Sequence, residues 1–138
     1  FRKIVGQLGK DLKERTIAIW GLSFKPETDD MREAPAINLI KAIINRGGRV
    51  QAYDPKAIHE AKFYLKGFDV NYFEDKYSVL INADALILVT EWKEFRSPDF
   101  SRMKEQMKGN LIVDGRNQYD SDSIHSLGFK YLQIGVKD

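Results

Sequence analysis

The stretch "IAIWGLSFKPETDDMREAP", residues 17–35, decides how the rest of the chain is interpreted. Its apolar start is typical of a buried strand, and that strand ends at Gly21, where a nucleotide-binding turn would begin. The second and third glycines of a G-x-G-x-x-G turn are missing, however. A long charged loop leads instead to Pro35, which suits the first turn of a helix. The stretch therefore predicts a strand, a loop and a helix without a dinucleotide-binding turn.

Strands and helices alternate along the rest of the chain. Apolar runs predict strands at residues 16–21, 49–53, 68–72, 85–90, 111–113 and 130–134. Residues 85–90, "ALILVT", form the most apolar of these runs and are expected at the centre of a sheet.

Amphipathic periodicity and capping residues predict helices at residues 35–46, 56–65, 75–82, 97–107 and 120–126, and the tail of a helix within residues 1–13. The helix at 97–107 is expected to have Ser97 or Asp99 at its cap and Pro98 in its first turn. Together the elements predict an α/β, Rossmann-like three-layer sandwich, with a mostly parallel sheet of about six strands and helices on both faces.

Composition excludes several classes of function. The 138 residues are 43% hydrophobic, which suffices for one domain with a core. The 22 basic and 20 acidic residues give a net charge of +2, too balanced to indicate a nucleic-acid or membrane partner. The absence of cysteine excludes a disulfide scaffold and a cysteine nucleophile within this chain. His59 and His125 are not spaced like a metal pair, so we expect no metal site, and no run resembles a membrane span or a signal peptide.

Ligands of parallel sheets bind beside the carboxyl ends of the strands. This rule selects the loops at residues 22–34, 54–55, 91–98 and 114–119. Lys25 and Arg116 would then lie on the same edge, where two cations favour an anionic ligand. Two plainer interpretations stay open. The first loop could be a solvated connection that caps the next helix, and Arg116 could pair with Asp114 or Asp120.

Three further residues of these loops have structural roles as their simplest interpretation. Arg32 lies in an acidic loop and is expected to pair within it. Asp54 precedes a proline and is expected to form an Asx turn or a helix cap rather than to bind a ribose. Trp92 is expected to pack over the end of the sheet, although it could instead offer a stacking surface.

Four motifs occur in order along the chain: "GLSFKPETDDMREAPA" at 21–36, "YDPKA" at 53–57, "VTEW" at 89–92 and "VDGRN" at 113–117. In order and spacing they resemble the C-terminal domain of the UDP-glucose/GDP-mannose dehydrogenase family, and the resemblance covers almost the whole chain. It implies an enzyme that uses two NAD to oxidise the C6 alcohol of a nucleotide sugar, UDP-glucose above all, to a carboxylate.

The resemblance also implies roles for individual residues. Phe24 and Lys25 match a pair that contacts the nucleotide sugar, and Arg116 matches the arginine that binds the sugar end of the substrate. Arg32 matches an arginine that approaches NAD. The family binds NAD mainly in an N-terminal domain, and its catalytic cysteine lies in a central helical region that forms a homodimer. No catalytic residue is therefore expected in this chain.

The resemblance divides the chain in two. Residues 1–13 are expected to be the tail of the central helical region, and residues 14–138 the C-terminal UDP-sugar-binding domain. The start at Phe1 rather than Met fits a piece of a longer polypeptide. The resemblance implies that this polypeptide is a cytoplasmic enzyme of polysaccharide biosynthesis.

Two alternatives stay open. The substrate could be GDP-mannose or a UDP-N-acetylhexosamine, or the chain could be a stand-alone nucleotide-binding module without catalytic activity. The upstream sequence would separate the module from the enzyme, because only the enzyme needs a G-x-G-x-x-G turn and a cysteine there. Without those parts, this chain alone is expected to be inactive.

Overall fold

The computed structural model describes residues 2–133, and within them six strands form one sheet. The strands are β1 (Thr16–Trp20), β2 (Arg49–Tyr53), β3 (Val70–Tyr72), β4 (Ala85–Leu88), β5 (Leu111–Asp114) and β6 (Lys130–Gln133). Their order is β3-β2-β1-β4-β5-β6, and every neighbouring pair is parallel. The predicted α/β class is confirmed, and the strand expected at the centre lies there, beside β1.

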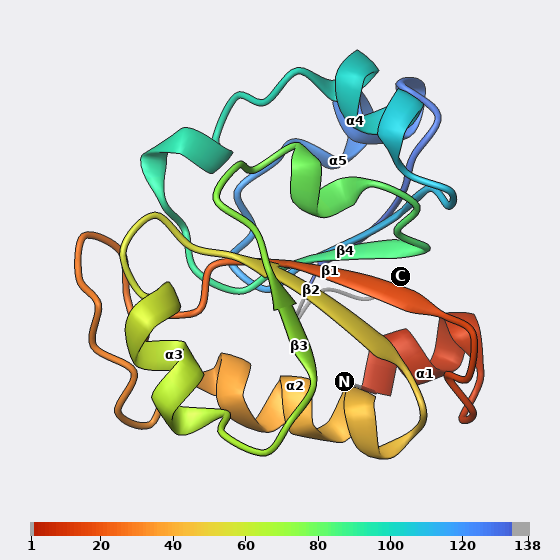
Figure 1. Cartoon of the computed structure of the whole chain (residues 1–138). Helices are drawn as coiled ribbons and strands as arrows, with labels where there is room; N and C mark the ends of the chain where they lie inside the picture. Colours follow the sequence, from red (N-terminus) through yellow and green to blue (C-terminus); the bar gives the residue numbers. More distant parts are fainter. Residues whose placement is uncertain (1, 134–138) are drawn as a thin grey trace.

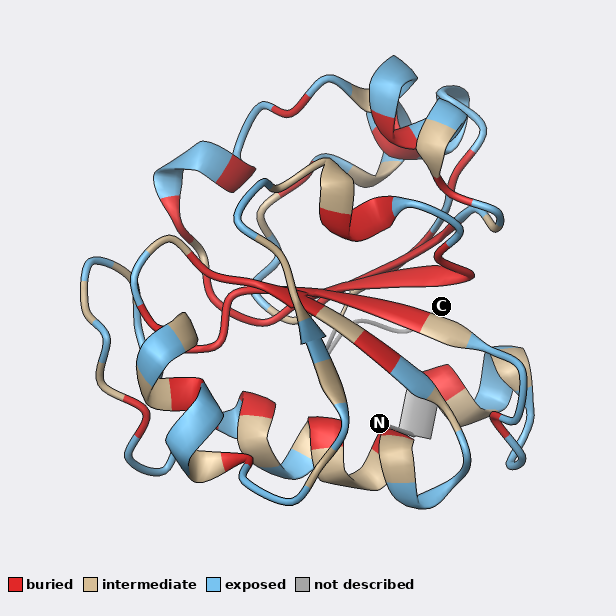
Figure 2. Ribbon diagram, in the orientation of Figure 1, coloured by how far each residue is buried: buried red, intermediate tan, exposed pale blue. Residues whose placement is uncertain are grey.

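Helices cover both faces of this sheet (Figure 1). One face carries α1 (Arg2–Leu8), α2 (Pro35–Asn45) and α3 (Ile58–Tyr64). The other carries α4 (Phe100–Gln106), α5 (Ser121–Ser126) and the short turns η1 (Ser78–Leu80) and η2 (Lys93–Phe95). Because both faces are covered, the central strands β1, β4 and β5 are buried along almost their whole length, whereas the edge strand β3 is only half-buried or exposed (Figure 2). This burial explains why the segments of the three central strands are mostly apolar in the sequence.

Side chains of each strand alternate between two separate cores. Ile17 and Ile19 of β1 join the core under α2 and α3, whereas Ala18 and Trp20 join the core under α4 and α5. In the second core, Trp20 stacks on Phe95 with the ring centroids 4.8 Å apart. The stack adds to the burial of two large aromatic rings, so this core is anchored by the turn η2 that follows β4.

Two predicted helices differ from the structure. The helix expected at 75–82 is only the 3₁₀ turn η1, and Asn82 has a positive φ of 61° that no helix continues through. The helix expected at 97–107 begins later, because the side chain of Asp99 caps it. Asp99 is thus the cap of the two residues proposed, and Pro98 lies before the helix rather than inside its first turn.

Some predicted ends also shift. Within residues 1–13 the described helix stops at Leu8, and Gly9 follows with a φ of 94°. The strand expected at 85–90 ends at Leu88. Residue 134, the predicted end of the last strand, and residue 1 lie outside the described residues.

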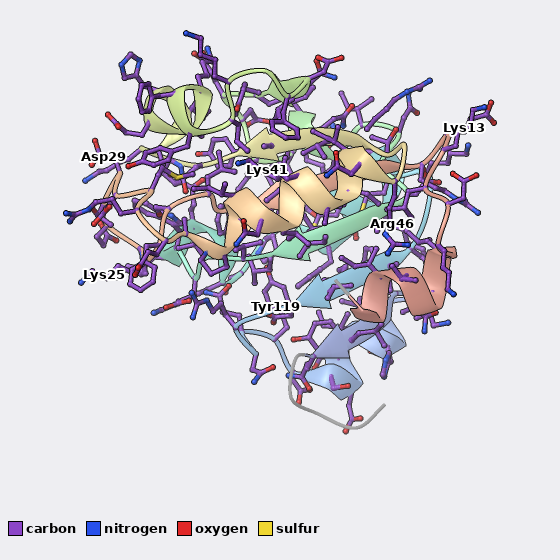
Figure 3. All side chains as sticks on the ribbon, turned by 90° about the horizontal axis from the view of Figure 1, so that it is seen from below. Lys13, Lys25, Asp29, Lys41, Arg46 and Tyr119 are labelled. Carbon is purple, nitrogen blue, oxygen red and sulfur yellow. The ribbon has the colours of Figure 1, made fainter. Side chains whose placement is uncertain are left out.

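The strand order places a crevice between β1 and β4. β2 and β3 follow β1 on one side, and β5 and β6 follow β4 on the other, so the loops after β1 and β4 leave in opposite directions. Figure 3 shows Lys25 and Asp29, both in the loop after β1, at one end of the molecule, and Lys13 and Arg46 at the other. Because every neighbouring strand pair is parallel, the candidate binding loops, which follow the carboxyl ends of β1, β2, β4 and β5, share the end that carries Lys25.

Candidate functional site

The loops after β1 and β4 touch at Gly21 and Thr90. Gly21 has a φ of 93°, and a Cβ added there would lie 2.5 Å from the Cβ of Thr90. The hydroxyl of Thr90 donates a hydrogen bond of 2.7 Å to the carbonyl oxygen of Ser23. A glycine is required here for both its positive φ and its lack of a side chain. The single glycine of the opening motif thus serves the meeting of two loops rather than a dinucleotide.

Asp54 fixes the start of the same loop from β2. Its Oδ1 accepts hydrogen bonds of 2.8 Å from the backbone N–H groups of Lys56 and Ala57, which is the expected Asx turn. Its Oδ2 accepts hydrogen bonds from the backbone of Leu22, at 2.7 Å, and of Ser23, at 3.2 Å. The second set of bonds was missed by sequence reasoning, because it joins groups more than 30 positions apart. Asp54 therefore shapes the first candidate loop as well as its own turn.

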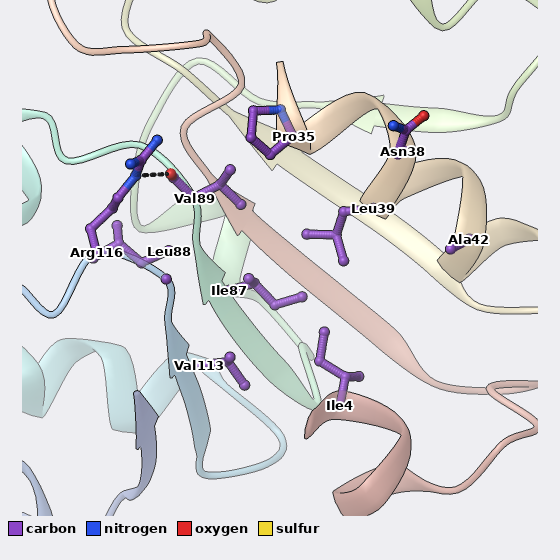
Figure 4. A pocket seen from close by; sticks show the side chains of 11 residues that line it. Ile4, Pro35, Asn38, Leu39, Ala42, Ile87, Leu88, Val89, Val113 and Arg116 are labelled. Atoms are coloured by element: carbon purple, nitrogen blue, oxygen red, sulfur yellow. Dashed lines mark hydrogen bonds between the residues drawn. The ribbon is translucent and has the colours of Figure 1, made fainter. Parts of the chain in front are cut away.

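Arg116 ties three loops together at this edge. Its Nε donates a hydrogen bond of 2.8 Å to the carbonyl oxygen of Val89 (Figure 4), and its Nη2 donates one of 3.5 Å to that of Phe24. Oε2 of Glu91 lies 2.9 Å from Nε and forms an ion pair. The side chain of Arg116 remains 35% exposed. The alternative that Arg116 pairs with Asp114 or Asp120 is therefore wrong for the guanidinium, which binds Glu91.

The partner Glu91 was not singled out from the sequence, although the strand register contains the signal. Leu88 of β4 pairs with Asp114 of β5. Glu91 and Arg116 follow these two residues closely, so they leave adjacent parallel strands at nearly the same height. Opposite charges at such positions are close enough to form an ion pair.

Asp114 holds the loop that carries Arg116. Its carboxylate is fully buried, and its oxygens accept hydrogen bonds from the backbone N–H groups of Arg116 at 2.8 Å, Gln118 at 2.6 Å and Tyr119 at 3.3 Å. The hydroxyl of Tyr131 donates to the same carboxylate at 2.5 Å. Burial, and then this hydrogen bond, raise the pKa of Tyr131 above its usual range. The hydroxyl therefore stays protonated and remains a donor to Asp114.

The remaining predicted site residues lie along the loop after β1. Phe24 is 44% exposed and Lys25 is also exposed. Arg32 binds Asp30 through Nε and Nη2, each at 3.0 Å, which confirms the expected pairing within the loop. The carbonyl oxygen of Asp30 also accepts a hydrogen bond of 2.8 Å from the N–H of Phe24. The structure therefore brings Phe24 against Arg116 and links Arg32 to Phe24 through Asp30.

An apolar hollow extends from this edge along the sheet face covered by α1 and α2 (Figure 4). Its volume is about 590 Å³. The lining comes from α1, α2, β4, β5 and the residues that follow the two strands: Ile4, Pro35, Asn38, Leu39, Ala42, Ile87, Leu88, Val89, Val113, Gly115 and Arg116. A hollow of this size and character is typical of small-molecule sites. Of the predicted site residues, Arg116 alone also lines the hollow, so the hollow meets the candidate loops at Arg116.

Unpartnered polar atoms gather beside Arg116. Among the described residues, four buried side-chain atoms have no hydrogen-bond partner, and three of them are Oε2 of Glu91, Nε1 of Trp92 and Oε1 of Gln118. Trp92 itself is only 5% exposed, which confirms that it packs over the end of the sheet. All three atoms belong to residues that follow β4 or β5, and Oε2 of Glu91 nevertheless forms the ion pair with Arg116.

The described residues hold no group of three or more His, Asp or Glu side chains that could bind a metal ion. His59 and His125 both lie exposed on the surface. Across the same residues, every helix is too short or too polar to pass through a membrane.

Comparison with known proteins places this geometry in a family. Residues 18–121 match the UDP binding domain of the UDP-glucose/GDP-mannose dehydrogenase family. The chain is 44% identical to a UDP-glucose 6-dehydrogenase of Rhizobium meliloti over 99% of its length, and 46% identical to one of Pseudomonas aeruginosa over 88%. It spans only 31% and 28% of those two proteins.

A solved structure gives the same result. A UDP-glucose dehydrogenase from the archaeon Pyrobaculum islandicum matches 97% of the chain with a TM-score of 0.76 and 28% sequence identity. The chain covers 28% of that protein. The family match extends over most of the chain, and it contains all four predicted site residues and the loops that hold them. This chain therefore belongs to the UDP-glucose/GDP-mannose dehydrogenase family, in the part that forms the UDP binding domain.

Proposed function

We propose that this chain is the nucleotide-sugar-binding domain of an NAD-dependent UDP-glucose 6-dehydrogenase, which oxidises UDP-glucose to UDP-glucuronate. The observation that carries the proposal is the hydrogen bond from Arg116 to the carbonyl oxygen of Phe24, which joins Arg116 to the loop that carries Phe24 and Lys25 at the carboxyl edge of the sheet, in a chain of this family. Two relatives named UDP-glucose 6-dehydrogenase support this substrate over GDP-mannose or a UDP-N-acetylhexosamine.

Each of these residues has a role that fits its surroundings. Lys25 is exposed and supplies a mobile positive charge for the diphosphate. Phe24 presents part of its ring to solvent beside Arg116 and offers an apolar contact to the ligand. Arg116 supplies planar donors to the sugar end, because its guanidinium is anchored on two carbonyl oxygens and still reaches solvent.

This chain can contact NAD only through the exposed part of the loop after β1, where Arg32 lies. The loop after β1 lacks the glycine-rich turn, and Thr90 closes against Gly21 where such a turn would leave room for a pyrophosphate. Arg32, whose side chain is 80% exposed, can contact a dinucleotide held by another part of the protein. When bound there, NAD would accept the hydride from the sugar. The protein's own contribution here is one cation, oriented by Asp30.

The proposal extends to the whole polypeptide. Residues 1–13 would be the tail of a central helical region and residues 14–138 the C-terminal domain of a homodimeric cytoplasmic enzyme of polysaccharide biosynthesis. The small share of each relative that the chain spans supports this division. The competing function is a stand-alone binding module, and the sequence upstream of Phe1 distinguishes the two.

Arg116→Ala in the full-length enzyme tests the proposal. We expect UDP-glucose binding or turnover to fall about tenfold or more, because a hydrogen bond to a charged group is worth about 1.5–3 kcal/mol. Isothermal titration calorimetry and steady-state NADH formation provide the measurements. Arg49→Ala is the matched control, since Arg49 is exposed at the opposite end of β2 and should leave both unchanged. If Arg116→Ala and Arg49→Ala have the same kinetic constants, Arg116 does not bind the substrate.

A further inference from the structure

Glu91 contributes charge to Arg116 rather than a hydrogen bond. Its Oε2 lies 2.9 Å from Nε of Arg116, yet this oxygen is buried and has no hydrogen-bond partner in the described part of the chain. The N–H of Nε is directed at the carbonyl oxygen of Val89 instead. Glu91 is therefore a negative charge held against the guanidinium while the backbone fixes the orientation of that group.

The remaining donors of Arg116 are available to a ligand. A guanidinium has donors on Nε, Nη1 and Nη2. The described residues use Nε, for Val89, and one donor of Nη2, for Phe24. The other Nη donors have no acceptor among those residues, and the side chain is 35% exposed. Arg116 can therefore donate hydrogen bonds to a ligand although its positive charge is already balanced by Glu91.

We propose that Glu91 is a specificity-determining residue, which makes this site prefer a nucleotide sugar with a neutral sugar end over one that carries a carboxylate there. The inference rests on the proposed function, since that function places the sugar end at Arg116. A neutral hydroxyl can accept the free Nη donors without cost. A carboxylate at the same place would lie close to the carboxylate of Glu91 and be repelled by it.

This preference matters for the proposed reaction, because the substrate and product differ in this property. Oxidation of UDP-glucose replaces the C6 alcohol by the carboxylate of UDP-glucuronate. An arginine without a neighbouring acid would bind the product more tightly than the substrate. With Glu91 in place, the product loses this advantage and can leave.

The test is Glu91→Gln in the full-length enzyme, which removes the charge and keeps the size of the side chain. Isothermal titration calorimetry measures the Kd of UDP-glucose and of UDP-glucuronate. We expect the Kd of UDP-glucuronate to fall about tenfold and that of UDP-glucose to change by less than about twofold, because the removed term is a charge–charge interaction. The difference should shrink when the salt concentration rises from about 0.05 M to about 0.5 M.

Three further variants make the result specific. Glu105→Gln removes an exposed glutamate of α4, and the ratio of the two Kd values should stay at the wild-type value. Glu91→Ser should shift the ratio in the same direction as Glu91→Gln, since both remove the charge. In the double variant Glu91→Gln with Arg116→Met, the gain for UDP-glucuronate should disappear.

The possible failures can be told apart. If the Glu91→Gln enzyme binds both nucleotide sugars with the wild-type Kd values, Glu91 does not set specificity and the proposed function stands. If both ligands weaken equally, Glu91 only holds the loop, and the inference is wrong. If the wild-type enzyme binds neither nucleotide sugar, the proposed function fails and this inference fails with it.

Discussion

Arg32 was expected to pair within its own acidic loop, and its partner there is Asp30. Arg32 donates to the carboxylate through Nε and Nη2, and its own backbone N–H donates to Oδ1 at 2.9 Å. The carbonyl oxygen of Asp30 meanwhile receives the N–H of Phe24. Asp30 thus holds both Arg32, the residue proposed to contact NAD, and Phe24, a residue proposed to contact the substrate.

The Asp30 carboxylate should titrate far below its ordinary range. The hydrogen bonds from the Arg32 side chain, and then the one from its backbone, lower the pKa of Asp30 from 3.8 to about 2. A folded-state pKa below the unfolded value means that the pair stabilises the protein above about pH 4 and loses that contribution as the pH falls to about 2. An NMR titration of the Asp30 carboxyl carbon checks this value.

Arg32→Gln is the comparison for that titration. The variant lacks the guanidinium, so the Asp30 midpoint should move upward toward the ordinary value of 3.8. The difference in unfolding free energy between wild type and variant should also vanish at the acid end of the same window. A midpoint that stays near 2 in the variant would show that the loop backbone, not Arg32, depresses the pKa.

At the scale of elements, the loop after β5 depends on one buried carboxylate. Asp114 is the last residue of β5, and it collects three backbone N–H groups and the Tyr131 hydroxyl. Without these bonds, the loop would leave several buried donors unpaired. The position of Arg116 is therefore set by the residue two places before it as much as by its own contacts.

Asp114→Asn should lower the free energy of unfolding by about 2–4 kcal/mol. The introduced amide turns one acceptor into a donor that faces other donors, and unpaired buried groups in a charged network are costly. Urea unfolding followed by circular dichroism gives the measurement. Asp122→Asn, on the exposed side of α5, should stay within about 0.5 kcal/mol of wild type. If both variants unfold at the same urea concentration, the Asp114 network does not shape the loop.

The elements differ in how well the sequence predicts them. β2 was predicted with its observed bounds, because the short segment RVQAY is delimited by a Gly-Gly turn before it and by Asp54-Pro55 after it. The helix expected at 75–82 is shortened at both ends: the side chain of Asp75 accepts hydrogen bonds from the N–H groups of Tyr77 and Ser78 before the turn begins, and Asn82, with a φ of 61°, leaves the helical region after it. Periodicity alone does not reveal either boundary.

At the scale of the molecule, the sheet consists of two halves that meet at β1 and β4. Each half was predictable as alternating strands and helices, and the rule for parallel sheets selected the carboxyl edge that carries Arg116 as the candidate site, which stays a prediction. The partners of Arg116 were not predictable from composition, since they depend on how the halves are registered. Glu91 lies just after β4, in the same half as Arg116, whereas Phe24 belongs to the loop after β1 in the other half.

The junction of the halves itself rests on Gly21. The N–H of Val89 donates a hydrogen bond of 2.9 Å to the carbonyl oxygen of Trp20, so the backbones of both halves stay paired up to this point. Beyond it, Gly21 allows Thr90 to approach the first loop and to donate to Ser23. The crevice is thus closed at its base by a contact that tolerates no side chain.

Gly21→Ala should lower the free energy of unfolding by about 3 kcal/mol or more and weaken UDP-glucose binding by the full-length enzyme. The new Cβ would lie 2.5 Å from the Cβ of Thr90 and 2.6 Å from its backbone nitrogen, and φ is 93°. Shortening Thr90 to Ala should not rescue the variant, because the backbone nitrogen stays in place.

Gly6→Ala is the same substitution in a different setting. Gly6 lies within α1, has no neighbour within 4 Å of an added Cβ and needs no positive φ, so alanine should raise the unfolding free energy by about 0.5–1 kcal/mol. Urea unfolding of both variants measures the contrast. If the unfolding free energy falls for Gly21→Ala and rises for Gly6→Ala, the effect comes from the close approach of Thr90 to Gly21 and from the positive φ there, and not from the loss of a glycine as such. A mild effect of Gly21→Ala would mean that the two halves can move apart where β1 and β4 end. The contact between Phe24 and Arg116 would then have to form when the ligand binds.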